Sequence, residues 1–274
     1  MVLIEDILEV PRDCIVDAVI PKKEVFEAAD LNNKDKRIFT DLVKQIKWCY
    51  NFTEDNIRVN KFIDEERCYD EVELININLK YDNVHKIDVG KFKEDDKIDR
   101  IADIVMRFIP YPIILTIQYE DELKFYAAHI RESKADYEKI VVDGKILSTN
   151  WINMNKLNEI EEDFITKIQF NNFERTNFYS FYNSYFEAVV QHDGAMTAGG
   201  TVNLSVEEIK RIYEEISVLD LKIKEVEKEI SQEDNFNVKM ELNIKAHGFK
   251  QEKEKLINEL KGEWFGGSWI KWRE

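Results

Sequence analysis

The sequence has few of the residues that would define a secreted or a zinc-binding protein. Three cysteines and four histidines occur in 274 residues. The cysteines, Cys14, Cys49 and Cys68, form neither a CxxC pair nor an even set, which argues against a disulfide framework. The chain also does not open with the basic residues and long apolar run of a signal peptide. We therefore expect a cytoplasmic protein with reduced thiols.

Long apolar runs and an excess of basic residues are missing as well. The most apolar stretch, Ile109 to Ile117, contains two prolines and is shorter than the roughly 20 residues that a membrane-spanning helix needs. There are 39 Lys and Arg against 55 Asp and Glu, for a net charge of -16. Because phosphate neutralisation needs excess Lys and Arg, we expect neither membrane insertion nor freestanding nucleic-acid binding.

The chain does carry enough apolar and aromatic residues, 44% and 12%, to bury a sizeable core. Helical spacing of apolar residues predicts helices over Lys34 to Phe52, with Asn32 or Asn33 as the cap, and over Lys97 to Phe108. Alternation over Ile75 to Leu79 predicts a strand, and Ile113 to Tyr119 with Leu123 to Ile130 predicts a hairpin.

The second half of the chain becomes increasingly helical. Two short strands are predicted on either side of Asp143-Gly144, a favourable turn pair, and helices that cover the sheet follow from Asn155 to Val190. Gly194, Gly199 and Gly200 then predict a linker, because glycine loosens the backbone between two periodic segments. The domain organisation that we expect is an α+β domain with a mixed sheet and covering helices (1–190), a linker (191–204), a helical hairpin (205–262) and a Trp-rich tail (263–274).

The most regular pattern lies in the hairpin. Apolar residues follow an unbroken three-then-four spacing, which is the seam of a helix that packs lengthwise against another, as in a coiled coil. The seam residues are Ile209, Ile212, Ile216, Leu219, Ile223, Val226 and Ile230. A second helix over Phe236 to Leu260 follows a polar break. The pattern leaves open whether the seam pairs within the chain or between two copies.

Six segments of the sequence carry a resemblance to a known family. They are Ile20-Pro-Lys-Lys23, Asp30-Leu-Asn-Asn-Lys-Asp-Lys36, Ile109-Pro-Tyr-Pro112, Ala128-His129 with Arg131, Phe178-Tyr-Ser-Phe-Tyr182 and Gln232-Glu-Asp-Asn-Phe-Asn-Val-Lys-Met-Glu-Leu-Asn243. Together they resemble a bacterial family named only as domain of unknown function 4391. At the position after His129, where that family tends to carry a basic residue, this chain has Ile130. The resemblance implies no established activity. Members look like companions of helicase and DNA-methyltransferase genes in restriction or phage-defence clusters, which implies an accessory role.

A nuclease-like site is the nearest catalytic pattern. Such a site needs two carboxylates that hold a divalent ion and a lysine that stabilises charge. In this sequence the carboxylates would be Asp70 and Glu73, and the lysine would be Lys80. Asn78 stands where the second carboxylate of an acidic-x-Lys triplet would be, and an amide binds a hard cation more weakly. Charges on the exposed face of a strand are the ordinary explanation.

The histidines His85, His129, His192 and His247 are dispersed and form no zinc-ligand spacing, so we expect no metal and no cofactor. His129 stands out because Arg131, two residues on, shares its face of a predicted strand. The alternative is a hydrogen-bonded structural histidine. No Gly-rich phosphate loop with its lysine occurs either.

Two surface features have both an ordinary and a functional interpretation. Lys22, Lys23, Lys34, Lys36, Arg37, Lys44 and Lys47 could form a local patch for phosphates, although nearby carboxylates favour a solvated face. Three tryptophans, Trp264, Trp269 and Trp272, follow Gly262. They either fold back onto the hairpin or anchor a partner.

From these observations we expect a non-catalytic accessory or adaptor subunit, with the seam and the three tryptophans as its interaction residues. A protein partner, such as a helicase or a DNA methyltransferase, and homo-oligomers through the hairpin are the expected assemblies. The first alternative is a metal-dependent nucleic-acid enzyme that uses Asp70, Glu73, Lys80, His129 and Arg131. The second is an acidic binder in the basic groove of a DNA enzyme.

Overall fold

In the computed structural model, residues 4–29, 31–80, 95–133, 140–200 and 202–262 are described. The chain forms two compact units that divide at Val189/Val190. No helix in the described ranges is both long and apolar enough to cross a membrane. The elements of the first unit up to its helical layer are α1 (Ile4–Leu8), η1 (Arg12–Cys14), β1 (Ile15–Ile20), α2 (Lys22–Ala28), α3 (Asn33–Leu42), β2 (Val43–Thr53), α4 (Glu54–Ile57), β3 (Phe62–Ile63), β4 (Cys68–Tyr69), β5 (Glu71–Leu79), α6 (Asp95–Phe108), β6 (Ile113–Tyr119), β7 (Glu122–Glu132), β8 (Ile140–Ser148) and β9 (Ile152–Asn153).

The predicted α+β class with a mixed sheet is confirmed. Seven strands form one sheet in the order β1-β2-β5-β6-β7-β8, and β9 pairs with β7. Strands β5 and β6 are parallel, and α6 connects them in the chain; the other pairs of this sheet are antiparallel. Such a parallel pair requires a crossover, which a helix commonly supplies. Strands β3 and β4 form a separate two-stranded ribbon.

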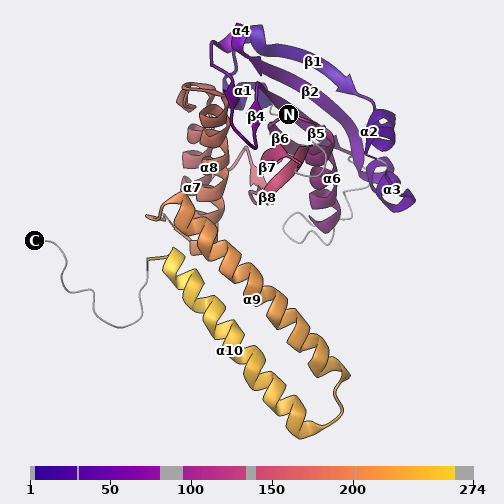
Figure 1. Cartoon of the computed structure of the whole chain (residues 1–274), viewed down its shortest axis with the longest axis vertical. Helices are drawn as coiled ribbons and strands as arrows, with labels where there is room; N and C mark the ends of the chain where they lie inside the picture. The colour runs from indigo at the N-terminus through magenta and orange to yellow at the C-terminus, as the bar shows by residue number, and fades with distance from the viewer. Residues whose placement is uncertain (1–3, 30, 81–94, 134–139, 201, 263–274) are drawn as a thin grey trace, which may run out of the picture. The chain divides into compact units, whose positions relative to one another are not determined.

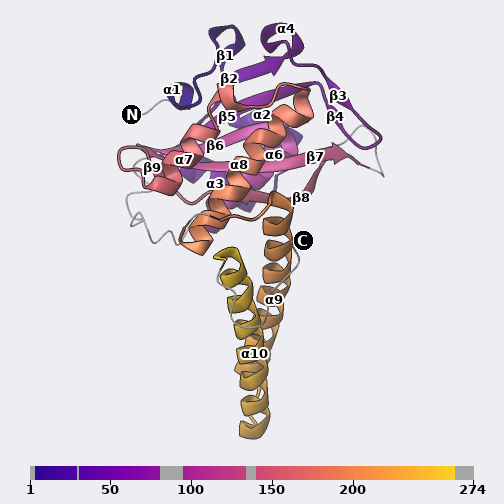
Figure 2. The ribbon, with the colours of Figure 1, turned by 90° about the vertical axis from the view of Figure 1, so that its left-hand side faces the viewer.

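Helices cover both faces of the sheet, as Figures 1 and 2 show. Helices α2, α3 and α6 enclose the main apolar core on one face, with Phe39, Ile77, Ile101, Val105 and Leu115 fully buried. The other face is covered by α7 (Glu159–Lys167), the turn η2 (Phe170–Asn172) and α8 (Phe178–Ala198). The strands in the middle of the sheet are therefore buried on both sides, which explains their nearly continuous apolar sequence.

The predicted helix over Lys34 to Phe52 is wrong in its second half. Helix α3 begins after the Asn32 cap, as predicted, but it ends at Leu42, and β2 begins at Val43. Ile46 and Tyr50 fit a helical period, yet Ile46, Trp48, Tyr50 and Phe52 also alternate. Because β2 pairs with β1 on one side and β5 on the other, backbone hydrogen bonding to distant strands favours the extended form.

The predicted turn at Asp143-Gly144 is also wrong, because both residues lie inside the single strand β8. The pairing of β7 with β8 shifts register between Ala127 and His129, where Ala127 pairs with Leu147 and His129 with Asp143. Gly144 has a φ of 83°, a backbone conformation that glycine adopts without strain. The glycine therefore forms a bulge in β8 instead of a hairpin turn.

The predicted linker 191–204 is largely helical, since α8 continues to Ala198. Gly194 lies inside α8, where a Cβ atom would stand 3.4 Å from the Ile209 side chain, so this glycine packs against Ile209 instead of loosening the backbone. The helix ends at Gly199, which has a φ of 74°, while the Gly200 N–H donates to the Ala195 carbonyl at 3.0 Å. This C-cap leaves only a short connection before Ser205 caps the next helix.

The second unit contains the predicted antiparallel hairpin, which pairs within the chain. Helix α9 (Val206–Gln232) and helix α10 (Phe236–Leu260) run side by side (Figure 1). Ser205 and Glu208 form a capping box at the start of α9, and Asn235 caps α10. Lys253 pairs with Asp220 at 2.6 Å and Lys250 with Glu227 at 2.8 Å across the two helices.

Candidate functional site

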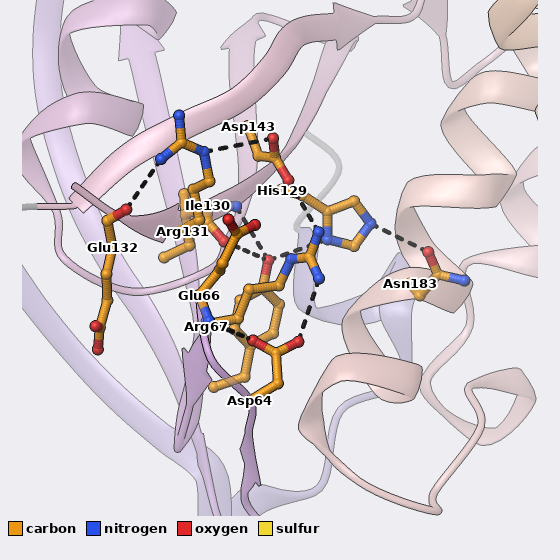
Figure 3. A network of polar contacts seen from close by, with 10 residues as sticks. Asp64, Glu66, Arg67, His129, Ile130, Arg131, Glu132, Asp143 and Asn183 are labelled. Atoms are coloured by element: carbon orange, nitrogen blue, oxygen red, sulfur yellow. Dashed lines mark hydrogen bonds and ion pairs between the residues drawn. The ribbon is translucent and has the colours of Figure 1, made fainter. Parts of the chain in front are cut away.

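His129 lies on β7 with its imidazole directed toward α8, and both of its ring nitrogens have hydrogen-bond partners. Nδ1 lies 3.0 Å from the Tyr69 hydroxyl, and Nε2 lies 3.1 Å from Oδ1 of Asn183, as drawn in Figure 3. The ring stacks on Tyr179, with 5.1 Å between centroids, and is 4.5 Å from the Phe186 ring. With 7% of the residue exposed, this imidazole is fixed in the interior.

Tyrosine hydroxyls form hydrogen bonds with the backbone of β7 beside the first residue of its neighbour β6. The register of β6 and β7 would place Ile113 opposite Ala128, but the Tyr182 hydroxyl lies there instead. It accepts from the Ala128 N–H at 3.1 Å and lies 2.9 Å from the Ala128 carbonyl and 3.1 Å from the Ile113 carbonyl. Two residues further, the Tyr69 hydroxyl accepts from the Ile130 N–H at 3.0 Å. These hydroxyls replace a strand partner at a buried gap in the sheet.

Two arginines and two aspartates lie beside His129 (Figure 3). Arg67 donates to Asp143 at 3.1 Å and to Asp64 at 3.3 Å, and its guanidinium lies over the Tyr179 ring. Nε of Arg131 is 3.7 Å from the other oxygen of Asp143. Two positive and two negative charges compensate one another, so the cluster has no net charge. Its contacts connect the β3–β4 ribbon, β7, β8 and α8, which indicates a structural role.

The structure does not bring the residues of the nuclease-like pattern together at one place. Glu73 is buried at the start of β5, where it accepts hydrogen bonds from Nε1 of Trp48 and, at 3.0 Å, from Nδ2 of Asn51. Lys80 follows the end of the same strand and donates to the Thr40 carbonyl at 2.6 Å. Seven residues of extended chain separate their Cα atoms by about 23 Å, which is too far for one metal site.

Asp70 and Arg131, by contrast, meet at one small pocket. They line a cavity of about 220 Å³ together with Cys68 and Tyr111. Burial, together with Asp70 and Glu132, raises the pKa of the Cys68 thiol, so the pocket does not favour a reactive thiolate. Among the described residues, no group of three or more His, Cys, Asp and Glu side chains is arranged to hold a metal ion.

Glu73 provides a pH-dependent prediction. Burial raises the pKa of its carboxyl to about 8, against about 4.3 for an unfolded Glu. The folded state therefore holds a proton that the unfolded state releases, and stability falls as pH rises from about 5 to 8, by an amount on the order of a few kcal/mol. Glu73→Gln should remove this slope. Urea unfolding of both proteins across that range measures it, and parallel pH profiles would contradict the assignment.

The remaining candidates occupy ordinary structural positions or lie outside the described residues. Cys14 and Cys49 are buried, and burial raises the pKa of the Cys14 thiol to about 11. Within the proposed basic patch, Lys47 pairs with Asp17 at 2.9 Å, and Lys23 and Arg37 each lie 3.5 Å from a carboxylate one turn along the same helix. His192 is buried in α8 and His247 is exposed on α10. His85, Trp264, Trp269 and Trp272 fall outside the described residues.

In the hairpin, the predicted seam separates into buried and partly buried residues. Ile216 and Ile230 are partly buried; the buried ones are Ile209, Ile212, Leu219, Ile223 and Val226. Other apolar side chains of the hairpin face solvent. On α10, Phe236, Met240 and Ile244 recur every fourth residue and are 75%, 51% and 68% exposed. Val218 and Leu221 are exposed on α9. The hairpin therefore presents more apolar surface than its own packing uses.

Sequence reasoning missed most of the cluster around His129. Tyr69, Arg67 and Asn183 come from separate elements, and no local period connects them. The one available signal was Phe178-Tyr-Ser-Phe-Tyr182, which carries Tyr179 and Tyr182 but also fits a simple covering layer. His129 and Arg131, which the sequence did single out, do lie together beside Asp143.

Comparison with known proteins places the chain in a family. No curated protein and no solved structure matches it. A family model does match, over residues 8–252, which covers most of the α+β unit and most of the hairpin. The chain belongs to the family described as Domain of unknown function (DUF4391).

Proposed function

We propose that this protein is a non-catalytic adaptor that binds a partner protein through its helical hairpin. The observation that carries the proposal is the row of Phe236, Met240 and Ile244 on α10, which lies apart from the packed seam and is more than half exposed. Exposed apolar side chains in a contiguous row are typical of interfaces. Lys239, Glu241 and Lys245 near the row carry mixed charges, which suits a protein surface better than a phosphate backbone.

The α+β unit supports the same interpretation. Both nitrogens of His129 are engaged, the nearby arginines are paired with aspartates, and Glu73 is far from Lys80 along β5. These groups are held by one another, so they favour a scaffold over a reaction centre. The partner that we propose is a helicase or a DNA methyltransferase of a cytoplasmic restriction or phage-defence assembly, in line with the gene companions that the family resemblance implies.

The test is affinity purification of the tagged full chain from its native cell, followed by mass spectrometry. The wild type should recover a helicase or a DNA methyltransferase, and Met240→Asp should lose it because a charge interrupts the apolar row. Glu241→Lys, next to it on α10, changes charge without changing the row and serves as the matched control. Circular dichroism checks that each variant stays helical. Recovery of neither enzyme by the wild type would overturn the proposal.

A further inference from the structure

Helix α9 has a second face, next to the one that packs against α10 in the hairpin. The face runs beside the seam with the same three- and four-residue spacing, and all of its side chains are exposed. Its residues are Glu207, Arg211, Glu214, Val218, Lys222, Glu225 and Glu229. Beside it lies a groove of about 850 Å³ between α9 and α10, with Val218, Leu219 and Leu256 among its apolar residues.

The charges of this face reverse about Val218. Glu214 lies four residues before Val218 and Lys222 four residues after it, which is about 6 Å to each side along the helix. Arg211 and Glu225 are placed in the same way, about 10 Å to each side. A two-fold axis perpendicular to α9 at Val218 would therefore bring Glu214 opposite Lys222 of a second, antiparallel copy. The same axis creates each pair twice, which is the property of an isologous interface.

An apolar centre lies where that axis would pass. Val218 is 50% exposed and lies on the axis, so it can be buried against its equivalent in the second copy. The alkyl stem of Lys222, which lines the groove, can cover Leu219 and Leu256. An apolar centre with charged residues around it is the usual arrangement of an interface.

We propose that two copies of this chain associate through α9 in an antiparallel pair with its two-fold axis at Val218. This surface is separate from the α10 row, so the inference goes beyond the adaptor role and stands without it. Arg211 already pairs with Glu215 and Glu259, and Lys222 Nζ lies 5.5 Å from the centroid of the Phe249 ring, so both side chains would exchange these contacts for the pairs with the second copy. Glu207 and Glu229 would face each other about 16 Å from the axis, where helices that cross at about 20° have begun to diverge.

The first experiment is sedimentation of the full chain over a range of concentrations and salt. The wild type should dimerise, and more weakly at high salt because the paired charges are screened. Glu214→Lys places lysines opposite each other twice and should weaken the dimer about tenfold or more. Adding Lys222→Glu restores opposite charges and should return the affinity to within about threefold. Glu241→Lys on α10, with the same charge change, should leave the dimer unchanged.

The second experiment determines the direction of the pair. A nitroxide label at Glu229→Cys, in a Cys68→Ser background because Cys68 is the exposed native thiol, should give a separation of about 33 Å or more between copies. A parallel pair would bring the same labels close together. A wild-type monomer at every concentration, a charge swap that fails to restore the dimer, or a short label distance would each overturn the proposal.

Discussion

Val226→Asp should open the hairpin while the α+β unit stays folded. Val226 is 3% exposed in the α9 seam, so the substitution buries a carboxylate without a partner. We expect the hairpin to lose on the order of 4 kcal/mol, because a buried unpaired charge is among the most destabilising of single changes. Hydrogen exchange measures the effect: amides of α9 and α10 should exchange much faster, and amides of β5 and β6 should keep their protection.

The matched control for this variant is Ile244→Asp. It also replaces an apolar residue of the hairpin with aspartate, but Ile244 is 68% exposed, so the new carboxylate remains in water. The change in stability should be within about 1 kcal/mol, most of it from the low helix propensity of aspartate. Equal loss of protection in both variants would show that the seam is not what holds the two helices together.

Tyr182→Phe should destabilise the α+β unit by about 3 kcal/mol, a large effect for the loss of one oxygen atom. The hydroxyl is the group that occupies the gap between Ile113 and Ala128, and the residue is fully buried. Without it, a backbone N–H and two carbonyls would be left in the interior with no replacement partner. The free energy of unfolding in urea, measured for both proteins, gives the difference directly.

Tyr179→Phe tests whether the effect belongs to the hydroxyl position and not to tyrosine in general. Tyr179 is on the same helix and packs against His129 and Arg67 through its ring, which phenylalanine preserves. We expect its stability to stay within about 0.5 kcal/mol of the wild type. Similar losses for the two variants would mean that the gap in the sheet does not depend on Tyr182.

Several elements could be predicted because local pattern and packing agreed. Helix α6, the β6–β7 hairpin and both hairpin helices have a period that fits only one type of structure. Asn32, the cap of α3, was one of the two caps expected. Strand β2 could not be predicted, because its apolar residues fit helical spacing and extended spacing equally well. Gly194 suggested a linker by its residue type alone, but it lies inside α8 and packs against Ile209.

The candidate sites show the same division. The sequence indicated His129 and Arg131 from their two-residue spacing on a strand, and it indicated the seam from its period. It could not indicate Tyr69, Arg67 or Asn183 as neighbours of His129, because Tyr69 and His129 are 60 residues apart and meet only when the sheet forms. Equally, it could not separate Glu73 from Lys80 before β5 was known to be one continuous strand.

The sequence by itself determined the acidic balance, the α+β class and the helical hairpin, because these depend on composition and on periods read within one segment. The tertiary structure alone decided that β2 is a strand, that tyrosine hydroxyls complete β7, and that the charges near His129 are already paired. It also decided which apolar residues of α9 and α10 remain exposed. The physical reason is that burial and hydrogen bonding between distant segments depend on the whole chain, whereas a local period fixes only which side chains share a face.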